Sequence, residues 1–162
     1  MINGFVDLTT AGWVHTVLAS VGILVGAEQL IRTRRDWWHR QLGYVYVASM
    51  VVADLSILTV YRFNGRFNAF HVGAIVNLLC LVMALRPMLA KPRPVQWRLV
   101  HYMWVSWSYV GLLAAALTEF LIRTRPFGVG AAPIAATVGA SAVVGVVGAV
   151  LIQRFRPRPV EV

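Results

Sequence analysis

The sequence predicts an all-α integral membrane protein: a four-helix up-down bundle joined by a fifth transmembrane helix. Two observations predict this fold class. The 162 residues are 59% hydrophobic and only 13% charged. Five apolar stretches of about 20 residues each have the length of a helix that crosses the hydrocarbon core of a bilayer. Short gaps separate the stretches, so consecutive helices should be antiparallel neighbours.

The five predicted helices are bounded by clusters of charged, aromatic and turn-forming residues. They should cover approximately residues 13–31, 39–61, 70–89, 99–122 and 129–152. We expect a single transmembrane domain with three parts. These are a histidine-bearing core over about residues 10–123, a packing helix over about 129–152 and a basic tail over 153–162.

Basic residues gather in the gap after the first predicted helix, in the gap after the third, and in the tail. Lysine and arginine favour the cytoplasmic side of a membrane, so we expect the N-terminus outside and the C-terminus inside. These basic faces would meet anionic lipid headgroups. The net charge of +9 is therefore explained without a nucleic-acid partner.

The four histidines of the chain lie one near the start of each of the first four predicted helices. They are His15, His39, His71 and His101. Coordinating side chains are costly at membrane depth, so they are rare there and tend to carry function. Because the helices alternate in direction, successive histidines alternate between the two faces. This pattern predicts two metal or haem sites, one near each membrane surface.

Diagonal helices of a bundle lie at about the distance that an imidazole–iron–imidazole unit spans. This predicts that His15 and His71 ligate an outer haem b, and that His39 and His101 ligate an inner one. Iron with two histidine ligands has no open position and suits one-electron transfer. Haem propionates need cationic partners, and the candidates are Arg34, Arg35, Arg40 and Arg98 inside and Arg62 and Arg66 outside.

Short polar residues precede the second and third predicted helices. Asp36 and Asn68 are suitable N-caps, because a short side-chain oxygen can accept from free backbone N–H groups of the first turn. His39 and His71 would then each occupy about the third helical position. The partial positive charge of a helix N-terminus favours the neutral imidazole, which is the form that binds metal.

Other polar side chains lie inside the apolar stretches. Glu119 is expected to pair with Arg123 four residues later. Asp54 has no local partner, so it would orient a histidine, relay protons, or serve as an oxygen ligand. In an alternative function, a zinc or copper site for hydrolysis or metal handling would use His15, His71, Asp54 and Glu119 near the outer face.

The fifth predicted helix has no histidine and no acid. Small residues recur in it every four positions, a spacing that lets helix backbones approach closely. We expect this helix to pack against the core or against a second copy in a homodimer. A further alternative function is non-catalytic: a transporter subunit or assembly factor whose histidines only pack or sense pH.

The stretch from the first to the last histidine resembles a family of predicted bacterial multi-pass membrane proteins of unknown function. The family pattern has one histidine in each of four helices, with a His-Arg-x-x-Gly phrase opening the second, here His39-Arg40-Gln41-Leu42-Gly43. The resemblance covers about residues 13–123 and leaves the fifth helix outside.

More broadly, the arrangement is similar to the four-helix dihaem membrane cytochromes b, the cytochrome b561-like group. Members of that group carry electrons between haems near opposite membrane faces, and some exchange electrons with quinones. The likeness implies that the four histidines are axial ligands. It also implies a membrane oxidoreductase with a quinone or a small redox protein as its partner.

Overall fold

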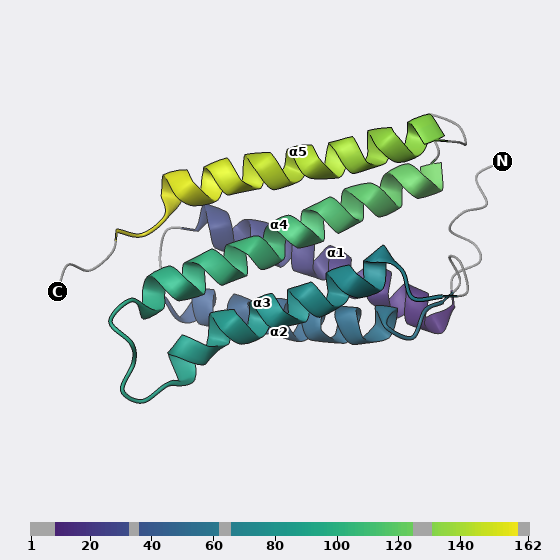
Figure 1. Cartoon of the computed structure of the whole chain (residues 1–162). Helices are drawn as coiled ribbons and strands as arrows, with labels where there is room; N and C mark the ends of the chain where they lie inside the picture. Colours follow the sequence, from purple (N-terminus) through teal and green to yellow (C-terminus); the bar gives the residue numbers. More distant parts are fainter. Residues whose placement is uncertain (1–8, 33–35, 62–65, 125–130, 159–162) are drawn as a thin grey trace. The chain divides into compact units, whose positions relative to one another are not determined.

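A computed structural model describes residues 9–32, 36–61, 66–124 and 131–158, and every regular element in these ranges is an α-helix (Figure 1). The prediction of an all-α chain is confirmed, and the observed bounds lie close to the predicted ones. The helices are α1 (Thr10–Ile31), α2 (Trp37–Ile57), α3 (Ala69–Leu89), α4 (Trp97–Thr124) and α5 (Ala131–Phe155).

Four helices in the described ranges are long and apolar enough to cross a bilayer. They are α1, α3, α4 and the Ala135–Phe155 part of α5. The prediction of an integral membrane fold is therefore confirmed. The five predicted spans are met by four helices, because α2 is not among them. Its 21 residues are long enough, but His39, Arg40 and Asp54 interrupt its apolar sequence.

The helix α2 also ends earlier than predicted, at Ile57. After Leu58 the hydrogen-bond spacing shortens, and the N–H groups of Thr59 and Val60 each donate to the carbonyl three residues earlier. Thr59 N donates to the Ser56 carbonyl at 3.1 Å, and Val60 N donates to the Ile57 carbonyl at 3.0 Å. The Thr59 hydroxyl donates to the same Ser56 carbonyl at 2.7 Å. This 3₁₀-type geometry is common where an α-helix ends.

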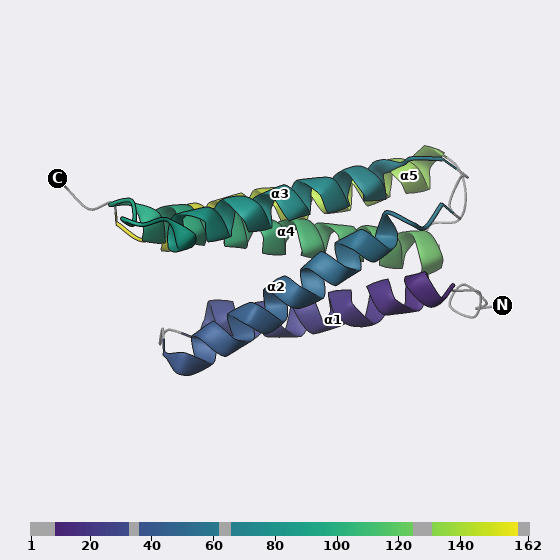
Figure 2. The ribbon, with the colours of Figure 1, turned by 90° about the horizontal axis from the view of Figure 1, so that it is seen from below.

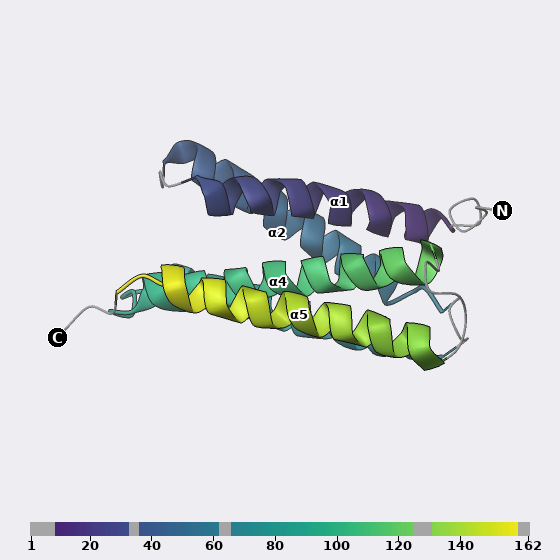
Figure 3. The same ribbon diagram turned by 90° about the horizontal axis from the view of Figure 1, so that it is seen from above.

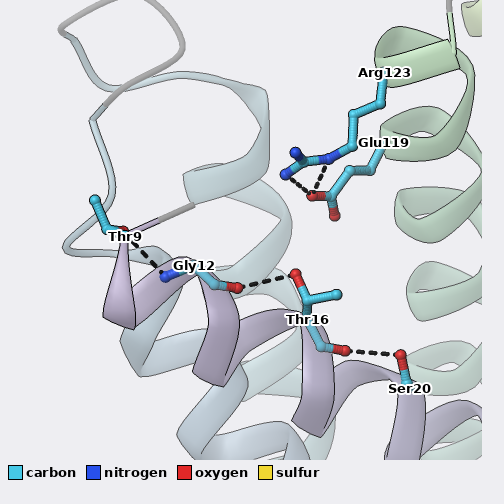
Figure 4. Close-up of polar contacts among 6 residues, drawn as sticks. All are labelled: Thr9, Gly12, Thr16, Ser20, Glu119 and Arg123. Carbon is cyan, nitrogen blue, oxygen red and sulfur yellow. Dashed lines mark hydrogen bonds and ion pairs between the residues drawn. The ribbon is translucent and has the colours of Figure 1, made fainter. Parts of the chain in front are cut away.

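Hydroxyl side chains in α1 are satisfied within the helix itself (Figure 4). Thr9 is the N-cap, and its side-chain oxygen accepts from Gly12 N at 3.1 Å. Thr16 donates its hydroxyl to the Gly12 carbonyl at 2.9 Å, and Ser20 donates to the Thr16 carbonyl at 2.8 Å. Such bonds remove the need for water, which a helix in lipid does not have.

The chain divides into two compact units, residues 1–78 and 79–162, and the boundary falls within α3. In the N-terminal unit, α1 and α2 lie side by side and run antiparallel (Figure 2). The buried side chains of α2 recur at the three- and four-residue spacing of one helix face. These residues are Tyr46, Ser49, Met50, Ala53 and Asp54.

In the C-terminal unit, α4 and α5 are also antiparallel neighbours (Figure 3). The Tyr102 hydroxyl donates to the Ile152 carbonyl at 3.3 Å. Toward the other end, the hydroxyls of Thr118 and Ser141 are 2.5 Å apart. Within this unit, α5 packs against α4.

The closest approach of α4 and α5 is at Gly148. A Cβ atom added there would clash with both γ-carbons of Val110 and lie 3.2 Å from its Cβ. Valine has little rotameric freedom in a helix, so it cannot turn away. Gly145 is one of the small residues that recur every four positions in this helix. A Cβ added at Gly145 would meet nothing within 4 Å, so this glycine is not at a close contact.

We expect Gly148→Ala to lower the free energy of unfolding of the C-terminal unit by about 1–3 kcal/mol, because the helices must separate to admit the methyl group. Gly145→Ala is the matched control and should be neutral, or stabilising by up to about 1 kcal/mol through helix propensity. Thermal unfolding of the two variants in the same detergent measures the difference. Equal stabilities would contradict this account of the contact.

Candidate functional site

The two predicted N-caps are confirmed. Asp36 precedes α2, and its Oδ1 accepts from His39 N at 3.1 Å. Asn68 precedes α3, and its Oδ1 accepts from Phe70 N at 3.0 Å. His39 and His71 are therefore each the third residue of their helix, as predicted. The bond from the His39 backbone N–H lowers the pKa of the Asp36 carboxyl below its ordinary value.

Two histidines donate a ring N–H to a backbone carbonyl of a neighbouring helix. His15 Nδ1 lies 3.0 Å from the Ala53 oxygen, and His101 Nδ1 lies 3.1 Å from the Ala84 oxygen. A carbonyl oxygen only accepts, so Nδ1 carries a proton in both rings. In the neutral ring the lone pair then resides on Nε2. Metal-binding histidines commonly have this arrangement, in which one nitrogen donates to a carbonyl and the other carries the lone pair that coordinates.

His71 is held in the opposite sense. Its Nδ1 accepts from the backbone N–H of Asn68 at 3.3 Å, so in the neutral ring the proton is on Nε2. A side chain at the third position that returns to the N-cap N–H is a capping-box arrangement. To coordinate a metal through Nε2, this ring would have to give up its bond to Asn68.

The His71 ring is almost completely enclosed, with a relative exposure of 1%. The rings of Tyr61 and Phe67 lie against it, with centroids at 4.9 Å and 5.0 Å. Its Nε2 is buried and has no hydrogen-bond partner among the described residues. A buried donor without an acceptor is costly, so this nitrogen marks a position where a further polar group would be stabilising.

His39 is half-buried, and its backbone connects α2 to α1. Its carbonyl accepts from the Gln29 side-chain amide at 2.6 Å. Gly43, the last residue of the His-Arg-x-x-Gly phrase, faces the same glutamine. A Cβ added at Gly43 would lie 3.4 Å from the Gln29 Nε2 atom. The space next to this glycine is therefore bordered by α1.

Asp54 is buried on α2, and its partner is an amide. Asn77 Nδ2 of α3 donates to Asp54 Oδ2 at 2.7 Å. The neighbouring carbonyl of Ala53 bonds the His15 ring, and a role of Asp54 toward a histidine stays a prediction. The two consecutive residues thus join α2 to both other helices of the N-terminal unit.

The remaining predicted site residues are Glu119 and the arginines. Glu119 pairs with Arg123, as predicted, through a 2.9 Å bond from Nε to the carboxylate (Figure 4). Arg40 and Arg66 are exposed. Arg34, Arg35 and Arg62 lie outside the described residues.

The described residues contain no group of three or more histidine, cysteine or acidic side chains that could hold a metal ion. In the N-terminal unit, His15, Asp54 and His71 are therefore not gathered into a common site. The structure gives no support to the alternative zinc or copper site. What it does provide is ring hydrogen bonds that orient His15, His71 and His101.

Sequence reasoning missed the partners that fix these side chains. The carbonyls of Ala53 and Ala84 are backbone atoms, so no residue type marks them. The Ala53 carbonyl also accepts from the Ser56 hydroxyl at 2.7 Å. Asn77 was recognisable as a polar residue in an apolar stretch, but its pairing with Asp54 depends on how α2 and α3 pack.

NMR of the ring nitrogens should distinguish the Nδ1–H from the Nε2–H histidines. In ¹⁵N-labelled protein near neutral pH, we expect His15 and His101 to carry the proton on Nδ1, and His71 to carry it on Nε2. Ring ¹⁵N chemical shifts distinguish the two tautomers, and single His→Gln variants assign each signal. The same tautomer at all three positions would contradict the hydrogen bonds described above.

Removal of the Asn77 amide should leave the Asp54 carboxyl without its donor. We expect Asn77→Leu to lower the free energy of unfolding by about 1–3 kcal/mol. The double variant Asp54→Leu/Asn77→Leu should recover most of this loss, because it removes both buried polar groups. Thermal unfolding in detergent of the wild type, both single variants and the double variant tests the pair. Additive losses in the double variant would show that the two residues are not coupled.

Comparison with known proteins places the chain among membrane proteins. Residues 12–156 match the family described as "Predicted membrane protein (DUF2306)". No curated protein and no solved structure matches the chain. The match extends through α5, so the expectation that the family pattern stops near residue 123 was wrong. Because the match covers most of its length, the chain belongs to this predicted membrane protein family.

Proposed function

We propose that this membrane protein binds b-type haem and carries electrons between sites near the two faces of the bilayer. The observation that carries the proposal is the orientation of two imidazoles. His15 and His101 each donate Nδ1–H to a backbone carbonyl, which leaves Nε2 as the nitrogen with a lone pair. A neutral imidazole held this way fits an axial ligand of haem iron.

The haem would supply a one-electron couple, and iron with two imidazole ligands has no open position for substrate. The chain's own residues would orient the two imidazole ligands. The Ala53 and Ala84 carbonyls hold the rings against rotation, because each accepts at hydrogen-bond distance. A bond from Nδ1–H also increases the basicity of the opposite nitrogen, which strengthens its bond to a metal.

The other two histidines, His39 and His71, have different hydrogen bonds from His15 and His101. His39 lies at the third position of α2, where its backbone is held by Asp36 and Gln29. His71 would have to exchange its bond to Asn68 for a ligand bond. The pairing of His15 with His71, and of His39 with His101, stays a prediction from helix order.

The proposal extends to partners and location on the basis of the resemblance to dihaem cytochromes b. A carrier within the lipid would take electrons from a membrane quinol or a small redox protein and deliver them at the opposite face. The same reasoning assigns the chain to a bacterial inner membrane. The apolar helices α1, α3, α4 and α5 support association with lipid.

The test is the haem content of protein purified in mild detergent from haem-replete cells. We expect a sharp Soret band that shifts on reduction with dithionite. His15→Ala and His101→Ala should each lose at least half of the bound haem, because each removes a ligand. The matched controls are the adjacent variants Thr16→Val and Tyr102→Phe, which remove hydroxyls bonded to Gly12 and Ile152 and leave the imidazoles intact.

Colourless wild-type protein from such cells would overturn the proposal. Equal haem loss in a histidine variant and its neighbouring control would indicate general instability instead of a lost ligand. Elemental analysis of the same preparation distinguishes haem iron from zinc or copper bound without porphyrin.

A further inference from the structure

Exposed cations gather at one end of the C-terminal unit, where α3 ends, α4 begins and α5 ends. Two contacts hold these termini together. His101 Nδ1 bonds the Ala84 carbonyl at 3.1 Å, and the Tyr102 hydroxyl bonds the Ile152 carbonyl at 3.3 Å. We call the exposed cations here the basic end, and they are Arg86, Lys91, Arg93, Arg98, Arg154 and Arg156.

The basic end has no acid of its own. Glu119 is the single acidic residue between positions 79 and 158, and it pairs with Arg123 near the other end of α4. In the N-terminal unit, by contrast, Arg32 has acidic partners on both sides, Glu28 at 3.2 Å and Asp36 at 3.6 Å. Like charges gathered within this unit without an acid beside them repel one another, so an added anion would stabilise this surface.

The depth of the basic end in a membrane follows from the helices that carry it. Arg86 and Arg154 are in the last turns of α3 and α5, and Arg98 is the second residue of α4. All three helices contain apolar windows long enough to span the hydrocarbon. Cations just beyond such windows lie at the level of lipid headgroups, where anionic lipids attract them.

Two of the guanidinium groups share one aromatic ring. The central guanidinium carbons of Arg93 and Arg98 lie 5.1 Å and 5.4 Å from the centre of the Trp97 ring, which is half-buried. Stacking on an indole leaves the N–H edges of a guanidinium directed outward. Those edges match the oxygens of a phosphate group, and two guanidiniums beside one ring can each donate to a phosphate placed between them.

Apolar side chains are exposed among the cations. Leu89 is 77% exposed, Val95 is 58% exposed and Phe155 is 66% exposed. An inorganic phosphate ion has no apolar part that could cover these side chains. A phospholipid brings acyl chains that cover them while its phosphate reaches the arginines. The surface therefore favours lipid over soluble phosphate.

We propose that the basic end binds the headgroup of an anionic phospholipid, with its phosphate held by Arg93 and Arg98 beside Trp97. The remaining cations of the basic end attract further anionic headgroups around this site. The proposal does not require haem. None of these side chains is an axial ligand, only Arg98 was expected beside a haem propionate, and the test measures bound lipid.

The test uses the full chain in detergent with added phosphatidylglycerol or phosphatidylcholine. Native mass spectrometry counts bound lipid, and thermal unfolding measures stabilisation. We expect phosphatidylglycerol to bind in preference to phosphatidylcholine. The double variant Arg93→Gln/Arg98→Gln should lose this preference, with an affinity roughly 25-fold lower, about fivefold for each cation. Arg123→Gln, at the opposite end of α4, is the matched control and should keep it.

Two further arms make the result decisive. Arg93→Lys/Arg98→Lys keeps both charges, so it should fold and bind phosphatidylglycerol at an affinity between those of the wild type and the glutamine variant. Inorganic phosphate at millimolar concentration should neither stabilise the protein nor displace the lipid. Equal binding of the two lipids, equal loss in Arg123→Gln, or full competition by inorganic phosphate would each overturn the proposal.

Discussion

The absence of water in the hydrocarbon of a bilayer is the constraint on which the rest of this structure depends. A polar side chain in such a helix must find its hydrogen-bond partner within the protein. The chain does this in two ways. The hydroxyls of Thr16 and Ser20 bond the preceding turn of their own helix. His15, Asp54 and His101 bond atoms of a neighbouring helix, so the same bonds that satisfy them also fix how the helices pack.

The helix α2 shows what this constraint does to a whole element. It has the length of a membrane span but not the composition. Its backbone carbonyls at His39 and Ala53 accept from α1, and its Asp54 side chain accepts from α3. Ser49, Ala53 and Asp54 lie on its buried face. Its place in the membrane therefore depends on protein neighbours more than on lipid. A helix of this kind is suited to carry a functional site, because two of its polar side chains, Ser49 and Asp54, are already buried.

Local rules in the sequence predicted a good part of the fold. Helix bounds followed from apolar length, and the caps at Asp36 and Asn68 followed from side-chain chemistry that acts within one turn. The pairs formed by Glu28 with Arg32 and by Glu119 with Arg123 also follow from spacing alone. The candidate site was harder to predict. The protonation of each histidine depends on whether its Nδ1 meets a carbonyl or an N–H, and this is decided by packing or by the exact turn.

The carbonyl partners of His15 and His101 also bear on how the site would vary among related chains. Ala53 and Ala84 are almost wholly buried, at 0% and 2% relative exposure. Since the acceptor is the main chain, any residue at these positions keeps the oxygen, and no exchange there needs a compensating change at the histidine. A bulky residue would instead force the helices apart and break the bond. Substitutions at these two positions would therefore not correlate with substitutions at the histidines. The contact would be visible instead as an upper limit on side-chain volume at positions 53 and 84.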